Sequence, residues 1–323
     1  MRRSWVCIFA LSFTAAACGS GAGSSATATD TDGGTATSTY DDSSVTVSPS
    51  STSGSTSEGN SNTSSGGTTE AGETTGASST SADESSSSGP AVVCDPPESL
   101  AVLFLGNSFT FSNDLPGMVS GLGEDAGIPI ETDSLTQGGQ PLSFHVQNEA
   151  TLPILESQAW DYVVIQGHSL ETLTDLDGFL QNGETLVGWI EEAGAEPLLY
   201  ETWARSWVHD IWDDPNFGYT NPDEMQNAVS DGYRMLSDLT GARVVPAGQA
   251  WQTLWSSPDG EMYYPWGGDE YHPSVVGTYL NASVFFVALT GVSLDAVEGV
   301  QPVNEDASQV LHDIAEQVEP PCR

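Results

Sequence analysis

The sequence contains no lysine among its 323 residues, and its six arginines are outnumbered by 45 aspartates and glutamates. The formal net charge is therefore −39 at pH 7. From residue 91 onward the imbalance persists, with 36 acidic residues against four arginines and a formal charge of about −32. A surface with so few cations repels nucleic acid, anionic lipid headgroups and polyanionic substrates. The composition excludes these partners, and we interpret the charge as a solvated acidic surface.

An apolar run long enough to span a membrane is missing from the N-terminus. The stretch 5–17 has about 13 apolar positions, whereas a transmembrane helix needs about 20. It follows Met1-Arg2-Arg3 and ends in small residues before Cys18, which predicts a signal peptide over 1–17. Small residues followed by cysteine resemble a bacterial lipoprotein box, although Ala15 stands where leucine is usual. We expect lipidation at Cys18 and a place in the cell envelope or at the cell surface of a bacterium; an ordinary secretory signal is the alternative.

Large apolar side chains are nearly absent from residues 18–90, which consist mostly of Ser, Thr, Gly and Ala. Such a segment cannot bury enough surface to offset the loss of chain entropy, so we expect a disordered tether. The folded domain should then occupy 91–323, a length sufficient for one well-packed core.

Cysteine is also scarce, with four in the chain. Cys7 leaves with the signal peptide and Cys18 is the lipidation candidate, so Cys94 and Cys322 remain. The termini of a compact domain often lie close together, and an exported protein meets oxidising conditions. We therefore expect a disulfide between Cys94 and Cys322. Neither cysteine has a CxxC partner that would indicate metal binding, and the five histidines show no ligand spacing.

Within the domain, short apolar runs alternate with helical periodicity. The runs, rich in Val, Ile and Leu, favour parallel strands that are covered on both faces. We predict a doubly wound, flavodoxin-like α/β/α sandwich around a mainly parallel five-stranded sheet. The expected strands are 100–105, 128–132, 162–165, 197–201 and 243–246, and the expected helices are 115–126, 142–157, 178–193, 223–239 and 274–289, the last of which closes the domain.

Three short motifs carry residues suited to acyl transfer. Gly106-Asn107-Ser108-Phe109-Thr110 follows the first strand, Gly138-Gly139 follows the second, and Asp269-Glu270-Tyr271-His272-Pro273 precedes the last predicted helix. A serine on a sharp turn after a strand exposes its hydroxyl. Together with a histidine and an aspartate three residues apart, it supplies a nucleophile, a base and an orienting acid. Ligands of such folds bind at the carboxyl ends of the strands, where these motifs should meet.

In order and spacing, the three motifs resemble the SGNH/GDSL hydrolase superfamily, and the resemblance covers most of 99–290. It implies that Ser108 is the nucleophile, His272 the general base and Asp269 the residue that orients the imidazole. It also implies an oxyanion hole formed by the backbone N–H groups of Ser108 and Gly139.

The sequence departs from that superfamily at the third oxyanion donor. The superfamily usually has an asparagine after the third strand, in a Gly-x-Asn-Asp setting, but this chain reads Gln166-Gly167-His168-Ser169. His168 or Gln166 is the expected replacement. His168 is favoured because it lies further beyond the strand end.

Expected substrate contacts are Asn107, Trp203 and Arg205. Aromatic residues are dense after the fourth strand and before the triad motif, and their faces can stack on sugar rings or acyl chains. Arg205 follows a strand end, where it would hold a carbonyl or carboxylate or else pair with Asp210. No cofactor or metal is expected.

The leading hypothesis is an exported, lipid-anchored serine esterase acting on short-chain acyl esters of a small molecule or glycan, such as O-acetyl groups on carbohydrate. A weakly active or inactive glycan-binding domain on a stalk is one alternative, and an acyltransferase of the same fold is another. The sequence leaves the acyl length, the alcohol and the oligomeric state open.

Overall fold

A computed structural model describes residues 95–321 of the chain. The predicted signal peptide, tether and lipidation site at Cys18 lie outside this range, as do both cysteines of the predicted disulfide, Cys94 and Cys322.

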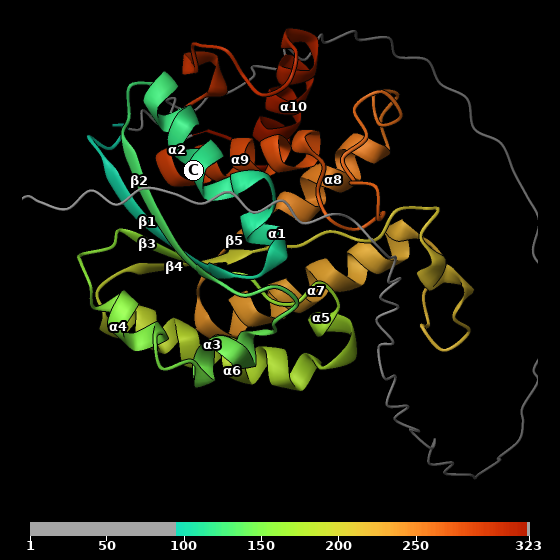
Figure 1. Ribbon diagram of the computed structural model, residues 1–323, viewed down its shortest axis with the longest axis horizontal. Coiled ribbons are helices and arrows are strands. Elements are labelled where there is room, and N and C mark those ends of the chain that lie inside the picture. The colour runs from blue at the N-terminus through green and yellow to red at the C-terminus, as the bar shows by residue number, and fades with distance from the viewer. Residues whose placement is uncertain (1–94, 322–323) are drawn as a thin grey trace, which may run out of the picture. The chain divides into compact units, whose positions relative to one another are not determined.

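The core of the described domain is one five-stranded sheet in which every strand pair is parallel (Figure 1). Valine, isoleucine and leucine fill the central strands and are buried on both faces, as a sheet covered by helices on both sides requires. The strand order is β2-β1-β3-β4-β5, which confirms the predicted flavodoxin-like α/β/α fold. The strands are β1 Leu100–Gly106, β2 Ile130–Thr136, β3 Tyr162–Ile165, β4 Glu196–Tyr200 and β5 Arg243–Val245.

Helices cover the two faces of the sheet as separate layers. Figure 1 shows α2, α8, α9 and α10 on one face and α3, α4, α6 and α7 on the other. The central helix α9 is buried along nearly its whole length, which explains why its sequence is apolar all round. The helices are α1 Ser108–Phe111, α2 Leu115–Asp125, α3 Leu142–Gln147, α4 Thr151–Leu155, α5 Glu171–Thr174, α6 Leu176–Glu192, α7 Pro222–Thr240, α8 Ala247–Trp255, α9 Val275–Thr290 and α10 Glu305–Val318.

The chain reverses its winding direction at β1. β2 pairs with one edge of β1 and β3 with the other, and the connections to β2 and β3 run over opposite faces of the sheet (Figure 1). The loops that leave the carboxyl ends of these neighbouring strands therefore turn to opposite faces of the sheet, and this strand-end edge is where ligands bind in doubly wound folds. The loops after β1, β2 and β3 carry Ser108, Gly139 and His168.

Two expectations about helices were wrong. The single helix predicted over 142–157 is broken into α3 and α4, because Pro153 lacks an N–H and its ring would clash with the carbonyl of Glu149 in a continuous helix. Asn148 turns the chain there, and its Oδ1 accepts a hydrogen bond from the Ala150 N–H at 3.0 Å. The helix predicted over 274–289 is present as α9, but it does not close the domain, because α10 follows it. Neither α8 nor α10 was predicted from the sequence.

Candidate active site

Ser108 stands on a tight turn between β1 and α1. Asn107 caps this short helix, with its Oδ1 accepting a hydrogen bond from the Phe109 N–H at 3.1 Å. Glycine is required at 106, because a Cβ there would lie 2.3 Å from Thr110 Oγ1. The turn therefore depends on the small residue before Asn107, and it leaves Ser108 partly exposed at the strand end.

The structure brings Ser108, His272 and Asp269 into one hydrogen-bonded chain. His272 Nε2 lies 2.8 Å from Ser108 Oγ, and its Nδ1 lies 2.6 Å from Asp269 Oδ2. The other oxygen of Asp269 accepts the backbone N–H groups of His272 at 3.0 Å and Tyr271 at 3.3 Å. The carboxylate is thus fixed by its own loop, and it holds the imidazole with Nε2 facing the serine hydroxyl. This is the arrangement in which a histidine can take a serine proton.

Asp269 remains ionised in this setting. Partial burial raises the pKa of its carboxyl group, but hydrogen bonds from the His272 ring and from the backbone N–H groups of His272 and Tyr271 outweigh that effect and lower the pKa below its ordinary value. A carboxylate that stays charged can stabilise an imidazolium next to it.

Stacked aromatic rings pack under the two loops that carry the triad, in the interior of the domain. Trp203 is sandwiched between Phe109, at 4.3 Å between ring centroids, and Trp251, at 4.1 Å. Its indole N–H donates to the backbone carbonyl of Tyr271 at 2.9 Å. Trp203 is fully buried, so the expectation that it contacts substrate was wrong. The ring instead joins the nucleophile loop to the loop of His272.

The triad loop contains one residue with an unusual backbone. Glu270 has φ of 66° although it is not glycine, a conformation that costs about 1–3 kcal/mol and persists only where the surroundings enforce it. Two hydrogen bonds from Ser206 hold Glu270 in this conformation. The Ser206 N–H donates to the Glu270 carbonyl at 3.0 Å, and the Ser206 hydroxyl donates to Oε2 of the Glu270 side chain at 2.7 Å. The loop is therefore tied to the segment that follows β4.

Two backbone N–H groups in the loops after β1 and β2 lack a hydrogen-bond partner in the described part of the chain. Among residues 95–321, neither the Ser108 N–H nor the Gly139 N–H donates a hydrogen bond to the protein. Gly139 has φ of +70°, a left-handed conformation that glycine adopts without strain. Both N–H groups belong to loops at adjoining strand ends, β1 and β2.

Gln166 and Asn107 are engaged with each other and with the loops. The Gln166 amide nitrogen donates to Asn107 Oδ1 at 3.0 Å and to the carbonyl of Gly167. Asn107 Nδ2 donates to the carbonyls of Gln140, at 2.9 Å, and Gly167, at 3.3 Å. Because both amides are buried and their N–H groups are in use, neither is placed to bind substrate or an oxyanion, contrary to expectation. They hold the loops after β1, β2 and β3 together.

His168 differs from Gln166 in having a ring N–H to offer. Its Nδ1 accepts the Leu170 N–H at 3.3 Å, which places the proton of the neutral ring on Nε2. Among the described residues Nε2 has no hydrogen-bond partner. Burial, and then the positive charge of Arg205, lower the pKa of His168, so the ring stays neutral near pH 7.

Glu171 positions His168, a role that the sequence did not reveal. Its buried carboxylate accepts the His168 N–H at 2.8 Å and the Leu142 N–H at 3.1 Å. Burial raises the pKa of this carboxyl, and the two backbone hydrogen bonds partly offset that. Glu171 follows Ser169 by two residues in the sequence, a pattern that is common at the start of helices. No sequence signal therefore distinguished Glu171 as a positioning residue.

Arg205 is a buried cation without a carboxylate partner among the described residues. Its Nη2 donates to Ser169 Oγ at 2.8 Å, and its guanidinium carbon lies 4.4 Å from the centre of the Tyr271 ring. Nε and Nη1 have no hydrogen-bond partner in the described part of the chain. Burial lowers the pKa of Arg205 to about 10, so it stays charged at pH 7. The predicted alternative partner, Asp210, contacts His209 instead, at 3.1 Å.

Within the described range, no three His, Cys, Asp or Glu side chains gather as metal ligands would. No helix there is long and apolar enough to cross a membrane.

Comparisons with known proteins give structural matches only, since neither the protein-family models nor the curated proteins produced a match. The chain is similar to a DUF4886 family protein from Bacteroides uniformis, with 21% identity and a TM-score of 0.57 over 70% of this chain and 96% of that one. It is also similar to a candidate SGNH hydrolase from Slackia heliotrinireducens, with 24% identity and a TM-score of 0.49 over 58% and 97% of the two chains. A lipase/acylhydrolase from Enterococcus faecalis matches with 15% identity and a TM-score of 0.46 over 62% and 99%. At these identities the likeness concerns the fold alone, and the match above a TM-score of 0.5 shows that the chain shares its fold with the protein from Bacteroides uniformis.

Proposed function

We propose that this protein is a serine esterase that hydrolyses short-chain acyl esters, such as O-acetyl groups on carbohydrate. The observation that carries the proposal is the hydrogen-bonded chain from Ser108 Oγ through His272 to Asp269, with distances of 2.8 and 2.6 Å. A serine with a purely structural role does not require a histidine next to its hydroxyl, nor a carboxylate that orients that histidine. A nucleophilic serine requires both.

The geometry supports a two-step acyl transfer. Ser108 Oγ attacks the acyl carbon while His272 Nε2 takes the hydroxyl proton, and the same proton then passes to the departing alcohol. A water molecule then gives a proton to His272 and attacks the acyl-serine; the bond from the acyl carbon to Ser108 Oγ breaks, His272 returns the proton to Oγ, and the carboxylic acid leaves. The Ser108 and Gly139 N–H groups and the His168 Nε2–H would bind the oxygen that becomes negative in each step.

The protein's location is part of the proposal. A signal peptide over 1–17, a lipid on Cys18 and a tether over 18–90 would hold the domain at the bacterial envelope or cell surface, where a Cys94–Cys322 disulfide could form. The acidic surface of the domain suits neutral substrates better than polyanionic ones.

Labelling of Ser108 tests the function directly. A fluorophosphonate probe should modify the wild-type protein at Ser108, and the purified protein should hydrolyse p-nitrophenyl acetate. Ser108→Ala should lose both properties, whereas Ser134→Ala, which removes an exposed hydroxyl on β2, should keep them. Absence of both labelling and turnover would favour the alternative of a glycan-binding domain. Transfer of acetyl to an added sugar in preference to water would identify an acyltransferase.

A further inference from the structure

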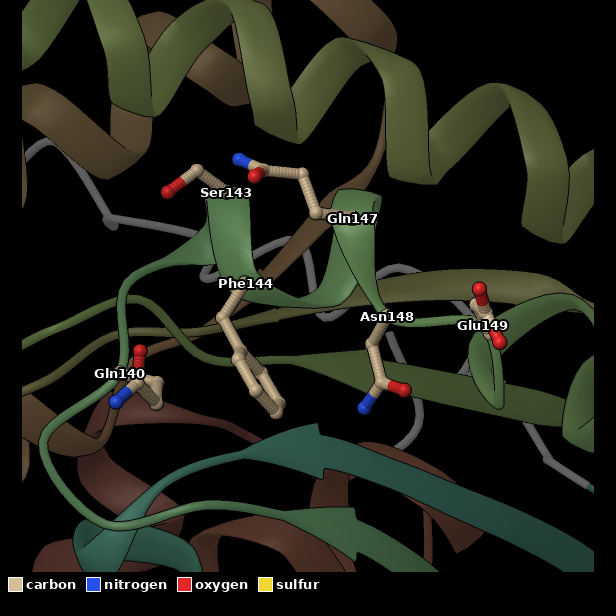
Figure 2. Close-up of a pocket in the computed structure, with 6 residues that line it drawn as sticks. All are labelled: Gln140, Ser143, Phe144, Gln147, Asn148 and Glu149. Atoms are coloured by element: carbon tan, nitrogen blue, oxygen red, sulfur yellow. The ribbon is translucent and has the colours of Figure 1, made fainter.

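An open cavity of about 500 Å³ lies beside the loop that carries Gly139. Its volume falls within the range of roughly 300–1,000 Å³ that small-molecule sites occupy. Figure 2 shows the residues that line it, which belong to α3 and its two flanking turns: Gln140, Ser143, Phe144, Gln147, Asn148 and Glu149.

The cavity is fixed relative to the nucleophile. Gln140 directly follows Gly139, and its carbonyl accepts the Asn107 amide at 2.9 Å. His145 lies on the opposite side of α3, and its ring is buried. His145 Nε2 is 3.1 Å from the carbonyl oxygen of Gly106, which precedes Ser108 by two residues. A molecule seated on the outer side of α3 would therefore be held at a constant position next to the proposed oxyanion loop.

The lining offers hydrogen bonds that the protein itself leaves unused. Among the described residues, the side chains of Gln140, Ser143 and Gln147 make no hydrogen bond. The Asn148 amide uses its oxygen for the Ala150 N–H and keeps its NH₂ group free. Figure 2 shows the Phe144 ring projecting from α3 on the same side as the Asn148 amide. Ser143 and Gln147 project from the other side of α3 in the same view, and all four side chains line the one cavity (Figure 2).

This chemistry narrows the class of ligand. No lining residue is cationic, so the cavity has nothing to pair with a phosphate or a carboxylate. Phe144 is its one large apolar side chain, which is too little wall for a long acyl chain. Amides, a hydroxyl and an aromatic face suit a neutral sugar, whose hydroxyl groups exchange hydrogen bonds and whose C–H face packs on a ring.

We propose that this cavity is a subsite for a neutral, hydroxyl-rich sugar ring of the alcohol portion of the substrate. The inference rests on the proposed esterase function and names its substrate class as acylated neutral glycans. The subsite would hold the sugar while its ester group reaches Ser108 across the Gly138-Gly139 loop.

Paired substrates test the subsite in the active protein. Gln147→Ala and Phe144→Ala should each lower kcat/KM for O-acetylated xylo-oligosaccharides by about tenfold, as expected for one lost ring contact or hydrogen bond. Both should leave kcat/KM for p-nitrophenyl acetate unchanged, since that ester has no sugar. Gln181→Ala, an exposed position on α6, is the matched control and should change neither. An equal loss on both substrates, or no loss on the sugar ester, would overturn the proposal.

A binding measurement separates the subsite from the esterase activity. Calorimetry with the Ser108→Ala protein should detect xylotetraose or cellotetraose, weakened by Phe144→Ala, and should give no signal with tetragalacturonate. Saccharide binding of this kind would support the subsite even if no turnover were found. An active esterase that binds none of the neutral tetrasaccharides would refute the subsite while leaving the esterase function intact.

Discussion

Replacing His168 by alanine should lower kcat by about 10²–10³, with KM nearly unchanged. The loss corresponds to about 2.7–4 kcal/mol, the typical cost of one oxyanion donor. KM should hold because the donor acts on charge that develops only in the transition state. His168→Gln, which restores a side-chain N–H in roughly the same place, should recover part of the rate.

The structure gives three reasons to expect this size of effect. The Leu170 N–H donates to Nδ1 and so leaves the proton on Nε2. The Glu171 carboxylate accepts the backbone N–H of His168 at 2.8 Å and fixes its position. Burial, and then the positive charge of Arg205, lower the pKa of His168 and keep the ring neutral. A donor that is already oriented needs no reorganisation during the reaction, which is what makes such groups effective.

Steady-state kinetics on p-nitrophenyl acetate measures the effect, with thermal melts to show that the variant is folded. The control is His312→Ala, which removes a half-buried histidine on α10 that contacts Tyr279 at 2.7 Å rather than the triad. If His168→Ala keeps kcat within about threefold of wild type, the reasoning is refuted and the oxyanion hole has only its two backbone donors.

Three further outcomes are expected. Asp269→Asn should lower kcat by about 10⁴, because an amide cannot hold the same histidine tautomer; a pH–rate profile with unchanged kcat would contradict the assigned role. Arg205→Met should raise the pKa of His168 in an NMR titration, since the positive charge that opposes its protonation is removed, whereas Arg205→Lys should leave that pKa low; equal values in both variants would disprove the electrostatic link. Burial raises the pKa of Glu201 to about 7, so the folded state keeps a proton that the unfolded chain releases near pH 4.5. The free energy of unfolding should therefore fall by roughly 3 kcal/mol between pH 4.5 and 7 from this group alone. Glu201→Gln should remove that part of the slope in urea titrations, and an identical slope in the variant would count against it.

The sequence by itself determined the architecture and the chemical groups. Buried strands rich in Val, Ile and Leu must be covered on both faces, so their alternation with amphipathic helices specified the α/β/α fold. Because parallel strands end at one edge of the sheet, Ser108, Gly139 and His168 could be expected to meet there. The spacing of Asp269 and His272 likewise allowed one loop to carry both groups.

Only the tertiary structure decided what the neighbouring polar and aromatic residues do. Trp203, Asn107 and Gln166 look like site residues because they follow strand ends, but all three are buried, and their hydrogen bonds go to other parts of the protein. Their partners lie 59 or 68 residues away along the chain, and local periodicity carries no information about contacts at such separations. The same holds for Glu171, whose carboxylate reaches Leu142. Burial and hydrogen-bond saturation are properties of the packed chain, and they separate the residues that face a substrate from those that hold the site together.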